Sequence, residues 1–110
     1  MRSYLVDEVS GSDIRKACEF LNRNAIRSDI EDVFWVPLPE SLLSIAQVQH
    51  PHCAPHVFAI ELGDTWIKVE FFVRSLASLR CECQSYTTPE QMQFIIEFLH
   101  HMLSELDIET

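Results

Sequence analysis

The sequence predicts an α+β domain, a two-layer sandwich with helices on one face of a mostly antiparallel sheet. Residues 57–62, 66–74 and 79–86 alternate apolar and polar side chains, which is typical of strands with one face buried in a core. Residues 14–25 and 92–106 repeat apolar side chains at three- and four-residue intervals, which is typical of amphipathic helices. Elements of these two kinds pack as layers around one core.

One domain accounts for the whole chain, residues 1–110. The sequence has no internal repeat, no linker rich in glycine and serine, and no break in composition. At this length folding removes roughly two thirds of the unfolded chain's surface from water, so a core forms without disulfide staples. The 47% of hydrophobic residues exclude a disordered chain. Two glycines, Gly11 and Gly63, are too few for a glycine-rich phosphate-binding loop.

The N-terminal half is predicted to begin with a strand over residues 4–9, followed by a helix that Ser12 caps. The apolar face of this helix consists of Ile14, Ala17, Cys18, Leu21 and Ala25. Residues 33–38 are apolar on both faces, as in a central strand, and prolines end that strand. Residues 40–48 form a short covering segment. They fit either a short helix or irregular backbone, and Pro39 favours the helix.

The C-terminal half is predicted to contain a three-stranded antiparallel meander and a long helix. A two-residue turn at Gly63-Asp64 joins the first two strands, and residues 79–86 form the third. The last helix has strong start signals, with Thr88 as its cap, Pro89 in its first turn and Gln91 as the partner in a capping box. The predicted order is therefore β-α-β, a short covering segment, then β-β-β-α.

The charges are unevenly distributed between the two long helices. Four of the eight basic residues lie on the polar side of the first helix, whereas residues 89–110 contain five acidic residues and no Lys or Arg. Acidic side chains at the C-terminal end of a helix oppose its dipole. We therefore expect the two helices to lie side by side, so that the basic side chains of the first helix offset the acidic side chains at the C-terminal end of the last helix.

The net charge of −9 opposes binding to nucleic acid and to anionic membranes, and it favours encounter with basic proteins. No apolar run approaches the eighteen or so residues that a membrane helix needs. Asp7 and Glu8 interrupt the N-terminal region before an apolar signal-peptide core can form. The four cysteines do not follow a disulfide-scaffold pattern. These features predict a cytoplasmic protein with reduced cysteines.

One short segment is rich in metal-ligating residue types. Three of the five histidines and one cysteine fall within residues 50–56, namely His50, His52, Cys53 and His56. Imidazole and thiolate are the usual ligands of zinc and other late transition metals, so this cluster is a candidate metal site. Against it, adjacent residues rarely chelate one ion, and no second ligand pair lies nearby in sequence. Cys81 and Cys83 could supply that pair across the sheet, but strand alternation directs them into the core, where free cysteine behaves as a small hydrophobe. A histidine-rich turn without a cofactor is the alternative.

Aromatic side chains exceed what a two-layer core needs to bury. The apolar arc of the C-terminal helix spans roughly 200°, although a core-facing stripe needs only about 100° or somewhat more. Burying one large aromatic side chain is worth about 1.5–3 kcal/mol, so something is expected to cover these rings. The cover is either residues 40–49 or the first helix, or else a partner protein. The candidate partner-binding residues are Phe94, Phe98 and His101 on that helix and Trp66, Phe72 and Tyr86 on the outward face of the sheet.

No catalytic constellation is recognisable, and a Cys53–His56 nucleophile pair lacks a third group to orient the base. The leading hypothesis is a non-enzymatic protein-binding module of the chaperone, inhibitor, immunity or adaptor type. It is predicted to be a homodimer that uses the exposed aromatic side chains, and its acidic surface suits a basic partner. The alternative hypothesis is a domain that binds or senses zinc or another transition metal through residues 50–56.

Overall fold

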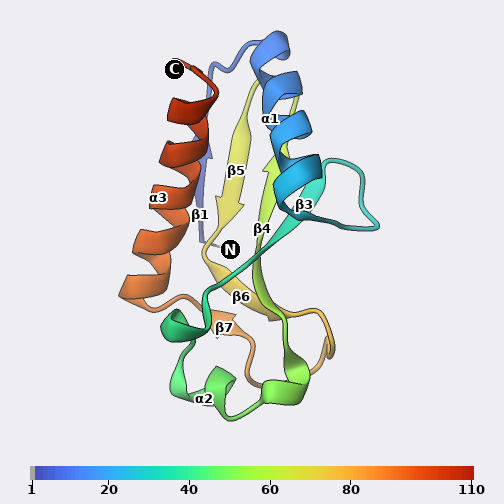
Figure 1. Ribbon diagram of the computed structural model, residues 1–110, viewed down its shortest axis with the longest axis vertical. Helices are drawn as coiled ribbons and strands as arrows, with labels where there is room; N and C mark the ends of the chain where they lie inside the picture. Colours follow the sequence, from blue (N-terminus) through green and yellow to red (C-terminus); the bar gives the residue numbers. More distant parts are fainter. Residues whose placement is uncertain (1) are drawn as a thin grey trace.

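The computed structural model, which describes residues 2–110, contains three helices and an open, mostly antiparallel sheet of seven strands (Figure 1). The predicted α+β class is confirmed. Five strands follow one path across the sheet, in the order β1 (Ser3–Val6), β5 (Ile67–Glu70), β4 (His56–Leu62), β3 (Val33–Pro37) and β2 (Ile26–Arg27). Two more, β6 (Phe72–Ser75) and β7 (Ser85–Tyr86), extend the sheet beyond the lower end of β4.

The inner face of the sheet carries the core, as the alternation of residues 57–62 predicts. Ile60 of β4 lies opposite Val69 on one side and Phe34 on the other, and all three are buried. Phe58 is fully buried as well, beneath the helices. The sheet is therefore held by apolar cross-strand pairs that the two long helices close off from water.

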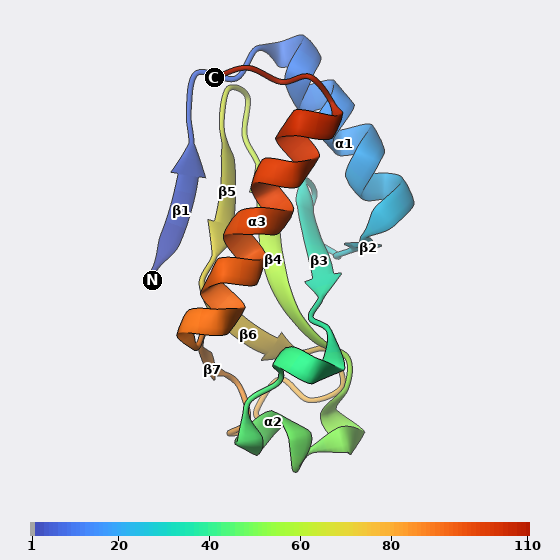
Figure 2. The same ribbon diagram turned by 60° about the vertical axis from the view of Figure 1, so that its left-hand side comes forward.

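The two long helices are α1 (Gly11–Asn24) and α3 (Pro89–Glu105), and both lie over the inner face of the sheet (Figures 1 and 2). They contact each other, since the rings of Phe20 and Phe98 lie 6.4 Å apart and Lys16 donates to the carbonyl of Leu106 at 3.4 Å. The two helices therefore touch at these points, with the Lys16 ammonium at the C-terminal end of α3, while compensation of the acidic residues of α3 by α1 stays a prediction. Within residues 2–110, no helix combines the length and the apolar character needed to cross a membrane.

The helix starts follow their capping residues. Thr88 caps α3 and forms a capping box with Gln91, as predicted. The prediction for α1 was wrong by two residues, because Ser10 rather than Ser12 accepts a hydrogen bond from the backbone N–H of Asp13, at 3.2 Å. Both residues are serines beside the same acidic first turn, and spacing alone does not distinguish them.

The C-terminal strands differ most from the prediction. The predicted strand over residues 66–74 is broken at Phe71, whose N–H donates to Arg2 and whose carbonyl accepts from Thr87. After this break β6 leaves the line of β5 and pairs with the start of β4. The predicted strand over residues 79–86 is also wrong, since only β7 pairs there and residues 76–84 form a loop.

The covering segment is a series of short helical turns. A 3-10 turn, η1 (Glu40–Leu42), leads to α2 (Ile45–Val48), and a second 3-10 turn, η2 (Pro51–Cys53), precedes β4. The predicted short helix is therefore confirmed over its last four residues. Ser44 caps α2 in a second capping box, with Gln47 as its partner.

A buried hydrogen bond joins the two capping boxes. The side chains of Gln47 and Gln91 have no exposed surface, and Nε2 of Gln91 donates to Oε1 of Gln47 and to the carbonyl of Leu42, each at 2.9 Å. Oε1 of Gln91 accepts from the backbone N–H of Thr88 at 3.0 Å. The pair therefore ties the covering segment to the start of α3.

Replacing Gln91 by Ala should lower the free energy of unfolding by about 2–4 kcal/mol, because it leaves buried polar groups without partners and opens a cavity. Urea denaturation measures this change. The control is Gln93→Ala, on the exposed side of the same helix, which should stay within about 0.5 kcal/mol of the wild type. Equal stability of the two variants would contradict the role assigned to the pair.

The turn between β4 and β5 depends on a glycine. The backbone N–H of Gly63 donates to the carbonyl of Trp66 at 2.8 Å, so the central turn residues are Asp64 and Thr65, one position later than predicted. A Cβ atom on Gly63 would lie 2.0 Å from Cε2 of Trp66. The indole ring therefore packs directly on the glycine backbone.

Gly63→Ala should displace the indole of Trp66 and destabilise the fold by about 1–2 kcal/mol, since a well-packed contact becomes overpacked. A shift in tryptophan emission and a lower urea midpoint are the expected signals. The matched control is Gly11→Ala, because no atom lies within 4 Å of its added Cβ. A Gly63→Ala protein with unchanged emission and midpoint would disprove the close contact.

Candidate metal centre

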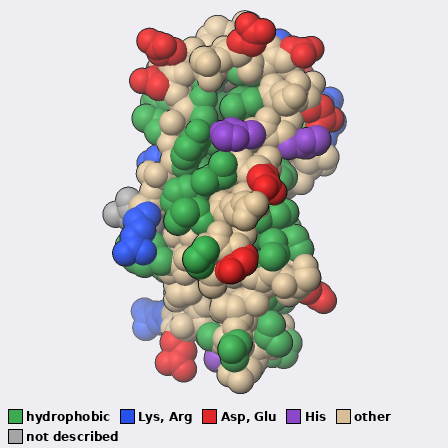
Figure 3. Space-filling view, turned by 90° about the vertical axis from the view of Figure 1, so that its left-hand side faces the viewer, with side chains coloured by type: hydrophobic (Ala, Val, Ile, Leu, Met, Phe, Trp, Pro, Cys, Tyr) green, Lys and Arg blue, Asp and Glu red, His purple; other side chains and the backbone are tan. Residues whose placement is uncertain are grey.

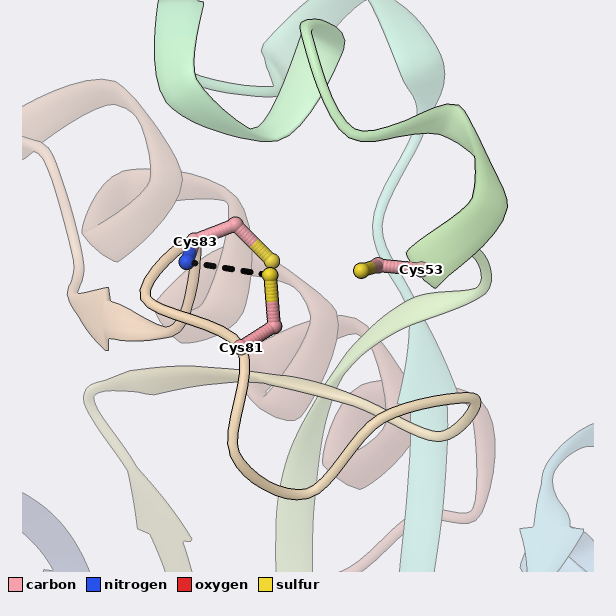
Figure 4. A group of neighbouring side chains, drawn as sticks. All are labelled: Cys53, Cys81 and Cys83. Atoms are coloured by element: carbon pink, nitrogen blue, oxygen red, sulfur yellow. Dashed lines mark hydrogen bonds between the residues drawn. The ribbon is translucent and has the colours of Figure 1, made fainter.

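Three cysteines from two distant segments meet at the end of the molecule that carries α2. Cys53 closes η2, whereas Cys81 and Cys83 lie in the loop over residues 76–84. Their three Sγ atoms all lie within 4.8 Å of one another (Figure 4). In the part of the chain that the structure describes, no other group of three or more Cys, His, Asp or Glu side chains brings its ligand atoms so close together.

Strand pairing brings the two segments side by side. His56 at the start of β4 lies opposite Ser75 at the end of β6. The buried hydroxyl of Ser75 donates to the carbonyl of Cys53 and accepts from the backbone N–H of Ser78 at 3.0 Å. The Ser75 side chain thus fixes the backbone at Cys53 relative to the start of the loop over residues 76–84, which carries Cys81 and Cys83.

Two side-chain amides hold the rest of that loop. Oε1 of Gln84 accepts from the backbone N–H of Ser75 at 2.9 Å, and its Nε2 donates to the carbonyls of Leu79 and Cys81 at 2.9 and 3.4 Å. On the other side, Nε2 of Gln47 donates to the carbonyl of Cys83 at 3.3 Å. These bonds take the place of a strand ladder, which explains why an alternating sequence does not form a strand here.

His56 provides a fourth donor beside the thiols. Its Nε2 lies 3.5 Å from Sγ of Cys83, and the residue is 3% exposed. Tetrahedral zinc, with Zn–S near 2.3 Å and Zn–N near 2.0–2.1 Å, separates a sulfur ligand from a nitrogen ligand by about 3.6 Å. The observed spacing fits that value. His56 lies outside the mutually close group of three thiols, so ligation by all four residues requires a movement of the ring or the loop.

The thiols differ in how readily they lose a proton. The backbone N–H of Cys83 donates to Sγ of Cys81 at 3.5 Å and lowers the pKa of the Cys81 thiol. Burial raises the pKa of Cys83 to about 12, and contact with the Cys81 thiol, together with burial, raises the pKa of Cys53. Burial, with a smaller effect of the charge on His50, lowers the pKa of His56.

The raised pKa values of Cys53 and Cys83 reflect their burial and their contacts with neighbouring thiols, whereas hydrogen bonds from Cys83 account for most of the lowered pKa of the half-buried Cys81. A divalent cation reverses the effect, because a coordinating thiol loses its proton outright and neutral imidazole is the ligating form. The chemistry of this donor set is therefore that of a soft or borderline metal such as zinc.

Two of the four residues predicted as metal ligands belong to this centre. Cys53 and His56 lie in it, whereas His52 is exposed and Nδ1 of His50 is hydrogen-bonded to the carbonyl of Ala46. The rings of His50 and His52 lie with their centroids 5.8 Å apart and their planes tilted by 46°. The structure thus brings Cys53 and His56 of the predicted set together with the other two thiols and places His50 and His52 in a neighbouring surface turn.

The sequence analysis set Cys81 and Cys83 aside as ligands because it placed them on a core-facing strand, whereas they lie in the loop over residues 76–84. A usable signal was present. Cys53-Ala-Pro-His56 and Cys81-Glu-Cys83 are two short pairs of metal-ligating residue types separated by residues 57–80. Structural zinc sites are typically built from two short pairs, although Cys81 and Cys83 are one residue closer than the usual Cys-x2-Cys spacing.

The predicted partner-binding residues of α3 are largely packed within the chain. Phe94 and Phe98 are half-buried, with ring centroids 6.4 and 5.8 Å from that of Phe58. The first helix thus supplies part of the expected cover, through the contact of Phe20 with Phe98. His101 is exposed, and its Nε2 lies 3.4 Å from Oε2 of Glu105. Figure 3 shows that the hydrophobic surface on the side of α3 is divided by histidine and acidic side chains.

The other three predicted aromatic residues lie apart from α3. Trp66 packs on the turn between β4 and β5, while Phe72 and Tyr86 meet edge to face with ring centroids 5.4 Å apart. Arg74 lies over the ring of Phe72 and Arg2 over that of Tyr86. Tyr86 is 43% exposed. Homodimerisation through these six residues therefore remains a prediction.

No family model, curated protein or solved structure matches this chain. Function is therefore inferred from the chemistry of the residues themselves, which a fold class alone does not provide.

Proposed function

We propose that this chain is a zinc-binding domain whose metal is held by Cys53, Cys81 and Cys83, with His56 as the fourth ligand. The observation that carries this proposal is the mutual approach of the three Sγ atoms within 4.8 Å. Three thiolates and one imidazole form one of the usual closed, tetrahedral ligand sets of structural zinc. Thiolate ligands also suit copper(I), and a metal analysis distinguishes the two metals.

A structural role fits the burial of the ligands. Cys53, Cys83 and His56 are buried and Cys81 is half-buried, so four protein ligands would close the coordination shell and leave no position for a substrate. The surrounding backbone consists of loops, short helical turns and two short strands. A metal that joins η2 to the loop over residues 76–84 would stabilise this end of the molecule by cross-linking it.

The thiols must stay reduced to serve as ligands, and reducing compartments maintain that state. We therefore propose a cytoplasmic location together with the metal site.

The metal content of untagged protein tests the proposal. The wild type should retain about one equivalent of zinc after gel filtration, and chelation should lower its Tm by about 10 °C, since loss of a tightly bound ligand removes several kcal/mol of stability. Cobalt substitution should give a thiolate charge-transfer band and the visible band of a tetrahedral site. Cys53→Ser, Cys81→Ser and Cys83→Ser should each lose most of the bound metal.

Two matched controls separate this centre from other candidates. Cys18→Ser removes the one cysteine outside the cluster, and His52→Ala removes the exposed histidine of the site predicted from sequence; both should keep the metal. His56→Ala should weaken binding and change the visible cobalt band. Wild-type protein without metal and without a thermal shift on adding zinc would refute the proposal, as would full retention in the three serine variants.

Ser75→Ala should weaken zinc binding about 10–100-fold, because Ser75 holds the backbone of Cys53 against that of Ser78 without contacting the metal. Competition with a colorimetric zinc chelator measures the change. Ser85→Ala, on an exposed residue of β7, is the control and should bind zinc like the wild type. Equal affinities would show that the hydroxyl does not position the site.

Protein binding without catalysis is a second candidate function. Ile45 and Val48 of α2 favour it, because both apolar side chains are exposed. The expected partners are a second copy of this chain or a basic protein.

A further inference from the structure

The short helix α2 buries its polar residue and exposes its large apolar residues. Its polar residue, Gln47, is completely buried, whereas Ile45 is 79% exposed and Val48 is 59% exposed. The buried bonds of Gln47 to Gln91 and to the carbonyl of Cys83 fix this orientation. A single exposed apolar side chain is ordinary, but here a helix of four residues directs both of its branched apolar side chains into solvent.

Two surface hollows flank these side chains. The first measures about 510 Å³ and is lined by apolar side chains that include Leu38, Leu43 and Val48. The second measures about 540 Å³, and Leu43 and Ile45 contribute to its lining. Leu43 is common to both, so the hollows lie next to each other along α2. Figure 3 shows hydrophobic side chains reaching the surface at this end of the molecule, beside acidic groups.

The charges around the hollows identify the kind of partner. Each hollow has one carboxylate in its lining, Glu40 in the first and Glu90 in the second, and no Lys or Arg from residues 2–110 lines either. A second copy would oppose like charges there, with a net charge of −9 on each chain. A segment with Lys or Arg beside its apolar residues would instead meet an opposite charge at each hollow.

We propose that α2 and its two flanking hollows form a docking surface for an amphipathic, basic segment of another protein. Two apolar side chains of the segment enter the hollows on either side of Ile45 and Val48, and neighbouring Lys or Arg side chains face Glu40 and Glu90. This is the helix-in-groove form of recognition, in which apolar anchors give affinity and flanking charge gives selectivity. The docking surface shares the Pro51–His56 segment with the metal centre. The apolar and acidic side chains that would contact the partner are not among the proposed zinc ligands.

A synthetic peptide tests the docking surface directly. The probe is a fluorescein-labelled amphipathic helix of about 14 residues built from Leu and Lys, and the comparison peptide replaces Lys by Glu. Fluorescence anisotropy should show saturable binding of the Leu/Lys peptide and at least tenfold weaker binding of the Leu/Glu peptide. Ile45→Ser/Val48→Ser should weaken Leu/Lys binding by about tenfold or more, as loss of interface anchors does.

Control variants distinguish binding at this surface from nonspecific hydrophobic binding. Leu79→Ser removes a side chain that is 84% exposed and lines neither hollow, and it should change affinity less than about twofold. Glu40→Gln/Glu90→Gln should weaken binding about three- to tenfold, most strongly at low salt. The zinc content of the Ile45→Ser/Val48→Ser protein should equal that of the wild type, so failure of docking and failure of the metal site give different results.

Four outcomes would overturn the proposal. They are affinity unchanged by Ile45→Ser/Val48→Ser, an equal loss in Leu79→Ser, equal binding of the two peptides, and no binding of the Leu/Lys peptide at millimolar concentration. Sedimentation of the wild type adds a fifth, because a dimer that Ile45→Ser/Val48→Ser dissociates would assign this surface to a second copy of the chain.

Discussion

The hydrogen bond between the buried amides of Gln47 and Gln91, at 2.9 Å, connects two parts of the molecule that are built differently. The upper part, as drawn in Figure 1, consists of the main sheet with α1 and α3, and apolar packing stabilises it. The lower part contains loops, short helical turns and two short strands, and its backbone depends on side chains for hydrogen bonds. Breaking a buried amide pair leaves polar groups without partners, which costs more than the bond itself contributes.

The thiol cluster lies at the far end of this polar network. Gln91 donates a hydrogen bond to Gln47, and Gln47 donates one to the carbonyl of Cys83. Ser75 donates another to the carbonyl of Cys53. The last two bonds end on backbone carbonyls and none of the three involves sulfur, so the Sγ atoms stay available as ligands. Fixing the backbone in advance lowers the conformational entropy that a metal would otherwise have to offset. Metal binding at the cluster, as proposed, would therefore depend on the hydrogen bonds that hold this part of the fold.

Features set by local sequence could be predicted, and features set by distant partners could not. The capping box of Thr88 and Gln91 needs residues three apart, and the buried face of β4 needs alternation alone. The same alternation in residues 79–86 gave a wrong strand, because period two does not show whether the backbone finds a partner, and the amide of Gln84 supplies one instead. Cys53 and His56 were found because they are neighbours in sequence. Their union with Cys81 depends on the pairing of β4 with β6.

Burying Gln47 and exposing Ile45 and Val48 are consequences of one constraint. A helix of four residues has a single inward side, and the polar network occupies that side with an amide. The apolar side chains of α2 must then face water, where each one forgoes about 1.5–3 kcal/mol of burial. In the upper part, aromatic side chains such as Phe94 and Phe98 recover this energy by packing on Phe58. In the lower part Ile45 and Val48 remain exposed, and binding of the partner segment proposed above would bury them.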